Sequence, residues 1–98
     1  MIAAKGLPGR GRVHYNLGLL LQQLKLDAAA EAALLTALEI EPDSLDYLYA
    51  LADHYLKRGK LEKARNIAEK MIEEHPHKSI GRDILKYINQ RQVQQKEP

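Results

Sequence analysis

Apolar residues recur every three or four positions along most of this chain, which is the spacing of one face of an α-helix. The first such segment covers residues 11–24, and its apolar positions are Val13, Leu17, Leu20, Leu21 and Leu24. Three further segments of the same kind begin near positions 27, 45 and 61, and a last one begins at Ile80. We find no stretch with the strict alternation of a β-strand. The pattern therefore predicts an all-α chain of five helices.

Residues that favour helix ends separate these segments. The expected N-caps are Asp27 for the second helix, Asp43 or Ser44 for the third and Ser79 for the last. The second helix is expected to end near Glu41, and the fourth stops before Pro76. Gly59 suits the left-handed conformation that commonly ends a helix, so we expect the third helix to end there.

Several residue types return at a constant step of 34 positions. They are Pro8, Pro42 and Pro76; Leu17, Leu51 and Leu85; Tyr15 and Tyr49; Gly18 and Ala52; and Ala30 and Ala64. A fixed step of this size indicates stacked supersecondary units, each of which here contains two helices.

The residues at these steps resemble the tetratricopeptide repeat family, whose units have 34 residues. The first unit matches the family pattern at His14, Leu17, Gly18, Leu21, Ala30, Leu34, Ala37 and Pro42. The second matches it at Leu48, Leu51, Ala52, Tyr55, Ala64, Ala68, Met71 and Pro76. The departures are His14 in place of a bulky apolar residue, and Ala68 and Met71 in exchanged order. The small residues in the pattern let the two helices of a hairpin approach each other closely.

The resemblance implies an α-α superhelix of two helical hairpins and a C-terminal capping helix. The units are residues 11–44, residues 45–78, a capping helix over 79–95 and a frayed tail over 96–98. Residues 1–10 are either the remnant of a preceding repeat or a flexible arm. The first interpretation is favoured because Ala3 and Pro8 stand 34 positions before Ala37 and Pro42. It leaves one face of the first helix uncovered, which gives the hypothesis of a homodimer through that face.

Composition and charge narrow the classes of function. The chain has 98 residues, no cysteine and a net charge of +2, so disulfides and thiol chemistry are excluded and a nucleic-acid or membrane partner is not favoured. Apolar runs stay far below the roughly 20 residues of a membrane span. The basic segment Gly9–Arg12 is expected to be a linker, with nucleic-acid binding as the least favoured reading. The compartment stays open between cytoplasm and periplasm.

The resemblance also implies a binding surface on the concave face, which the first helix of each hairpin lines. The residues at the family's ligand-contacting positions are Arg12, Tyr15, Leu19, Gln22, Gln23, Asp46, Tyr49, Asp53, Leu56 and Lys57, and the last helix adds Asp83, Tyr87 and Arg91 as further candidates. Tyr15 and Tyr49 are expected to lie side by side there. The alternative is that these tyrosines only cover the seam between hairpins.

Other chemistry is not indicated. The family's carboxylate clamp needs Lys and Asn where this chain has Tyr15, Leu19 and Ala50. The four histidines lack the spacing of a metal site, and no nucleophile motif is present, so we expect neither a cofactor nor an enzyme. The prediction is therefore a protein-interaction module that binds a partner peptide or helix. The alternative is an assembly segment of a larger bacterial enzyme or membrane-associated complex.

Overall fold

The structure, a computed structural model, describes residues 10–96 and contains five helices and no strand in that range. The helices are α2 (Arg10–Gln23), α3 (Asp27–Ile40), α4 (Leu45–Lys57), α5 (Leu61–Glu74) and α6 (Ile80–Lys96). This confirms the all-α prediction, and the bounds lie within two residues of those expected. The expectations for residues 1–9 and for the last two residues lie outside the described part.

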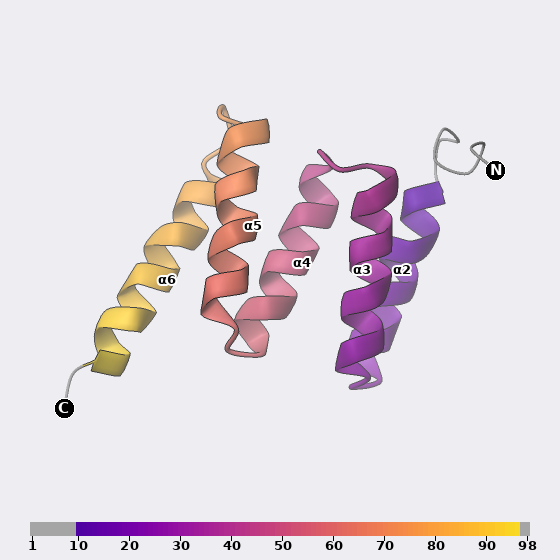
Figure 1. The fold of residues 1–98 in the computed structure, drawn as a ribbon, viewed down its shortest axis with the longest axis horizontal. Coiled ribbons are helices and arrows are strands. Elements are labelled where there is room, and N and C mark those ends of the chain that lie inside the picture. The colour runs from indigo at the N-terminus through magenta and orange to yellow at the C-terminus, as the bar shows by residue number, and fades with distance from the viewer. Residues whose placement is uncertain (1–9, 97–98) are drawn as a thin grey trace.

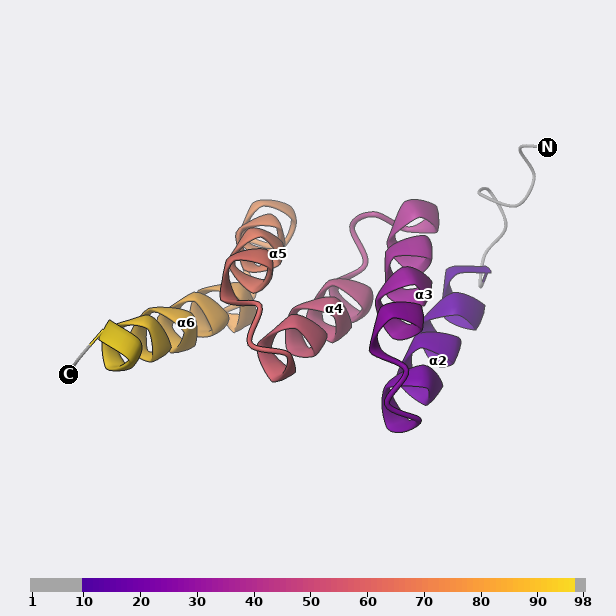
Figure 2. The same ribbon diagram turned by 60° about the horizontal axis from the view of Figure 1, so that its bottom comes forward.

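The helices stand in one row in chain order, with α2 at one end and α6 at the other (Figure 1). Each helix packs against its neighbour in sequence, and α2 also contacts α4. Viewed from below, α2, α4 and α6 follow one side of the row, while α3 and α5 follow the other (Figure 2). Two hairpins, α2–α3 and α4–α5, are thus stacked, and α6 covers the second.

The helix ends agree with the predicted caps at two places and differ at one. The Ser44 hydroxyl accepts a hydrogen bond from the Tyr47 N–H at 3.3 Å, and Gly59 has the left-handed φ of 75°. Asp27, however, is the first residue inside α3, and Leu26 is its N-cap. The carboxylate of Asp27 forms an ion pair with Arg58 of α4 instead of capping α3. It still lies in the first turn, where the helix dipole favours a negative charge.

The core joins α3, α4, α5 and α6. Its largest fully buried side chains are Leu34, Leu48, Leu51, Met71 and Ile88. Ala30 and Ala64 are also fully buried, as close packing within each hairpin requires. A Cβ added to Gly18 would stand 2.8 Å from the side chain of Leu34, so the absence of a side chain at Gly18 sets how closely α3 approaches α2.

One face of α2 differs from the equivalent faces of α4 and α6. Val13, Leu17, Leu20 and Leu24 form a stripe along α2, and these side chains are 44–63% exposed. Tyr47, Leu51 and His54, which stand 34 positions after the first three, are at most 3% exposed. The preceding hairpin covers that face in α4. In the described residues, no helix covers it in α2.

Candidate binding groove

The predicted site residues fall mainly into three hollows along the side formed by α2, α4 and α6. The first hollow lies between α2 and α4, at the ends where both helices finish. Its lining is Leu19, Gln22, Gln23, Lys25, His54, Lys57 and Arg58. Four of these seven are residues that the sequence placed in the site.

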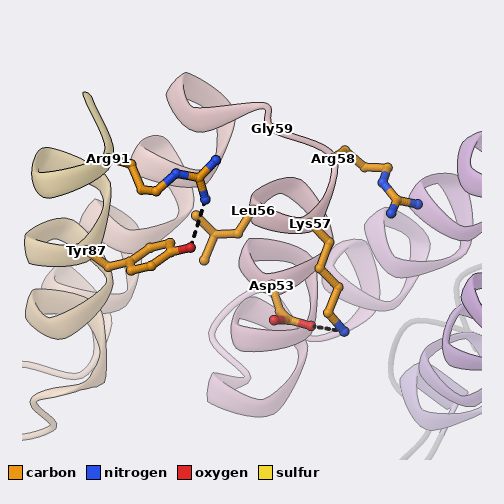
Figure 3. Close-up of a pocket in the computed structure, with 7 residues that line it drawn as sticks. All are labelled: Asp53, Leu56, Lys57, Arg58, Gly59, Tyr87 and Arg91. Carbon is orange, nitrogen blue, oxygen red and sulfur yellow. Dashed lines mark hydrogen bonds and ion pairs between the residues drawn. The ribbon is translucent and has the colours of Figure 1, made fainter. Parts of the chain in front are cut away.

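The second hollow lies between α4 and α6 and adjoins the first, because Lys57 and Arg58 line both (Figure 3). Its lining is Asp53, Leu56, Lys57, Arg58, Gly59, Tyr87 and Arg91. Leu56 lies between the Tyr87 ring and the pair formed by Asp53 and Lys57 (Figure 3). We call the two joined hollows the groove. It contains both an aliphatic and an aromatic surface, so it can hold apolar as well as polar groups of a ligand.

A third, separate hollow lies where α4 and α6 begin. Leu45, Asp46, Tyr49 and Ile80 line it. Asp46 and Tyr49 are therefore near α6 and not near α2. Asp83 is exposed on α6, where its carboxylate accepts a hydrogen bond from the Ser79 hydroxyl at 3.2 Å. It lines none of the three hollows.

The expected pair of Tyr15 and Tyr49 is wrong. Tyr15 stacks on Tyr47, with ring centroids 5.0 Å apart, and the Arg12 guanidinium lies 5.8 Å from the Tyr15 centroid. Tyr47 and Tyr49 are two residues apart in α4, which turns their side chains by about 200° relative to each other. Tyr47 therefore faces α2, and its hydroxyl donates to Glu41 at 3.0 Å. Tyr15 belongs to the packing between hairpins, as the alternative interpretation held for the tyrosines.

Sequence reasoning did not place His54 in the site, although it lies at the base of the groove. It is almost fully buried, and the Gln22 side-chain amide donates to its Nδ1 at 3.0 Å. Burial lowers the pKa of His54, and the nearby positive charge of Arg58 lowers this pKa further. The neutral ring is thus favoured, and neutral Nδ1 can accept the bond that joins α2 to α4. The 34-residue step gives the signal, because His54 occupies the position of Leu20 in the first hairpin.

Charge is unevenly spread in the groove. Four cations line it, namely Lys25, Lys57, Arg58 and Arg91, against the single carboxylate of Asp53. Asp53 accepts an ion pair from Lys57 at 2.9 Å, and the Arg91 guanidinium donates to the Tyr87 hydroxyl at 2.8 Å. The hollow at the opposite end carries Asp46 and no cation. The groove can therefore attract negative charge at one end while offering Leu19 and Leu56 to apolar groups.

Two other kinds of site are not formed by the described residues. In residues 10–96 no three His, Asp or Glu side chains converge as metal ligands would. The helices of this part of the chain are also too short or too polar to span a membrane.

Stacked antiparallel hairpins with a groove along their first helices define a helical-repeat protein. Family models described as tetratricopeptide repeat match residues 28–81 and residues 11–44, and the chain belongs to the tetratricopeptide repeat family. A comparison with curated proteins gives no match. Members of the family generally serve as protein–protein interaction modules and are typically non-catalytic scaffolds.

Proposed function

We propose that the chain binds an extended or helical peptide of a partner protein in the groove along α2, α4 and α6. The observation that carries this proposal is the continuity of the two hollows, which share Lys57 and Arg58 and thereby connect all three helices. Leu19, Leu56 and Tyr87 supply apolar surface between polar side chains. A few well-placed apolar and aromatic anchors with polar groups around them commonly dominate peptide binding.

The exposed side chains of the groove allow a test that leaves the core intact. Random twelve-residue peptides displayed on phage are selected on the immobilised chain, and selected peptides are titrated against the parent and against Leu56→Ala and Gln23→Ala. Loss of an anchor commonly costs at least 1.4 kcal/mol, which is a tenfold weaker affinity. We expect that loss for Leu56→Ala and a smaller one for Gln23→Ala.

A matched control is available on the opposite side of the row. Leu35 of α3 is 42% exposed and lines none of the three hollows, so Leu35→Ala removes the same atoms elsewhere. Its affinity should equal that of the parent, and circular dichroism checks that all variants are folded. Equal affinity in Leu56→Ala and the parent would contradict a site in the groove.

A second candidate function is assembly, and the exposed stripe on α2 favours it. We propose that a second copy of the chain covers Val13, Leu17, Leu20 and Leu24. The same positions in α4 are buried under a preceding hairpin, which supports the stripe as a surface suited to a packed helix. Apolar side chains aligned on one helix face lose contact with water when such a helix is added.

The assembly proposal predicts a mass that depends on concentration. Sedimentation equilibrium of the parent should show dimers that dissociate on dilution, whereas Leu20→Glu should stay monomeric because dimerisation would bury its charge. Leu35→Glu introduces the same charge outside the stripe and should dimerise like the parent. A parent chain that is monomeric at all concentrations would rule out this candidate.

A further inference from the structure

We propose that the ligand of the groove is an acidic peptide whose carboxylates bind to the cations Lys25, Lys57, Arg58 and Arg91. This inference rests on the peptide-binding function proposed above and names the chemical class of the partner. Its basis is the excess of four cations over one carboxylate in the lining of the two joined hollows.

The cations keep capacity for an external carboxylate. Lys57 is held by Asp53 at 2.9 Å, yet its side chain remains 62% exposed. Arg58 pairs with Asp27 and is still about one third exposed. The Arg91 guanidinium bonds a neutral hydroxyl at Tyr87, which leaves its charge without a carboxylate partner among the described contacts. A ligand with several carboxylates would therefore meet positive charge at both hollows.

The positions of the cations follow the repeat and not only the helix ends. Lysines and arginines at helix C-termini are common because they complement the dipole, which accounts for Lys57 and Arg58 at the end of α4. Arg91 does not fit that account, since α6 continues to Lys96. Instead, Gln23, Lys57 and Arg91 stand 34 residues apart, one on each of α2, α4 and α6. Three hydrogen-bond donors thus occupy equivalent positions along the groove.

Apolar surface between these donors favours a peptide over a phosphate backbone. Leu56 lies beside Tyr87 in the second hollow (Figure 3), and Leu19 lines the first. An extended peptide can place carboxylates and apolar side chains in alternation, which matches such a lining. The chain as a whole carries a charge of only +2, so the cations act as a local feature.

The test uses three labelled twelve-residue peptides that differ in one residue type. The acidic probe alternates Glu with Leu and Tyr, the neutral probe has Gln in place of Glu, and the basic probe has Lys there. A labelled single-stranded DNA of twelve nucleotides is the fourth probe. By fluorescence anisotropy we expect the acidic probe to bind at least tenfold more tightly than the neutral one. Its affinity should also fall as salt is added, because exposed charges are screened.

Single substitutions in the groove make the expectation specific. Lys57→Gln and Arg91→Gln should each weaken the acidic probe several-fold and leave the neutral probe unchanged. Asp53→Asn should strengthen the acidic probe, because it removes the only carboxylate of the lining. Lys86→Gln, on an exposed position of α6 outside the groove, is the matched control and should change neither affinity.

The outcomes separate this inference from the proposed function. If the neutral probe binds as tightly as the acidic one and Leu56→Ala weakens both, the groove binds peptides but the acidic class is wrong. If the DNA binds more tightly than the acidic probe and depends on Lys57 and Arg91, the ligand is a nucleic acid and the inference fails. If the acidic probe binds but is indifferent to all groove substitutions, both the acidic class and the groove are overturned.

Discussion

Replacing Leu51 by alanine is expected to lower the free energy of unfolding by about 2–5 kcal/mol, as large-to-small changes in a core do. Leu51 is fully buried in the cluster that joins α3, α4, α5 and α6. The lost methyl groups leave a cavity, because surrounding helices relax only in part. A small domain has only about 5–15 kcal/mol of stability, so the loss is a large share of the total.

Thermal denaturation followed by circular dichroism measures this effect. For a domain of this size, 1 kcal/mol corresponds to about 4–8 °C in Tm, so a decrease of about 8 °C or more is expected. Leu35→Ala removes the same atoms from an exposed position of α3 and should shift Tm little. Equal shifts in the two variants would show that Leu51 is not in the shared core.

Replacing Ala64 by leucine is expected to destabilise the second hairpin by about 1–3 kcal/mol through overpacking. Ala64 lies in the first turns of α5 and is fully buried where α5 packs on α4. A larger side chain there forces the two helices apart or into strained rotamers. Because α6 packs on α5, the displacement also loosens the capping helix.

Urea denaturation of Ala64→Leu should therefore show a lower midpoint than that of the parent. The matched variant is Ala29→Leu, at an exposed position in the first turn of α3, where added volume meets solvent. Its midpoint should stay close to that of the parent. An Ala64→Leu midpoint that matches the parent would contradict the close approach of α4 and α5.

Much of the fold could be predicted from the sequence, because helix periodicity and the 34-residue step are local or strictly periodic signals. The helix bounds are confirmed to within two residues, and Ser44 and Gly59 end their helices as predicted. Asp27 was misassigned by one residue as an N-cap. Its carboxylate has a distant partner in Arg58, which no local pattern could reveal.

The candidate site was predictable only in part. The concave positions carried over from the family do line hollows at Leu19, Gln22, Gln23, Lys57 and their neighbours in α4. The partner of Tyr15 was wrong, because contacts between neighbouring hairpins depend on how one helix is rotated and shifted against the next. A difference of two residues in α4 exchanges Tyr49 for Tyr47.

The sequence by itself determined the class of this protein, namely five helices in repeated hairpins with small residues where the helices meet. Periodicity is enough for that, since burying one apolar face of each helix leaves few arrangements. Only the tertiary structure decided which side chains share a surface. It buried His54 under Gln22 and brought Lys25, Lys57 and Arg91 to one groove from three helices. These contacts join residues more than 30 positions apart, and their geometry depends on how the helices cross, which the spacing of residues does not specify.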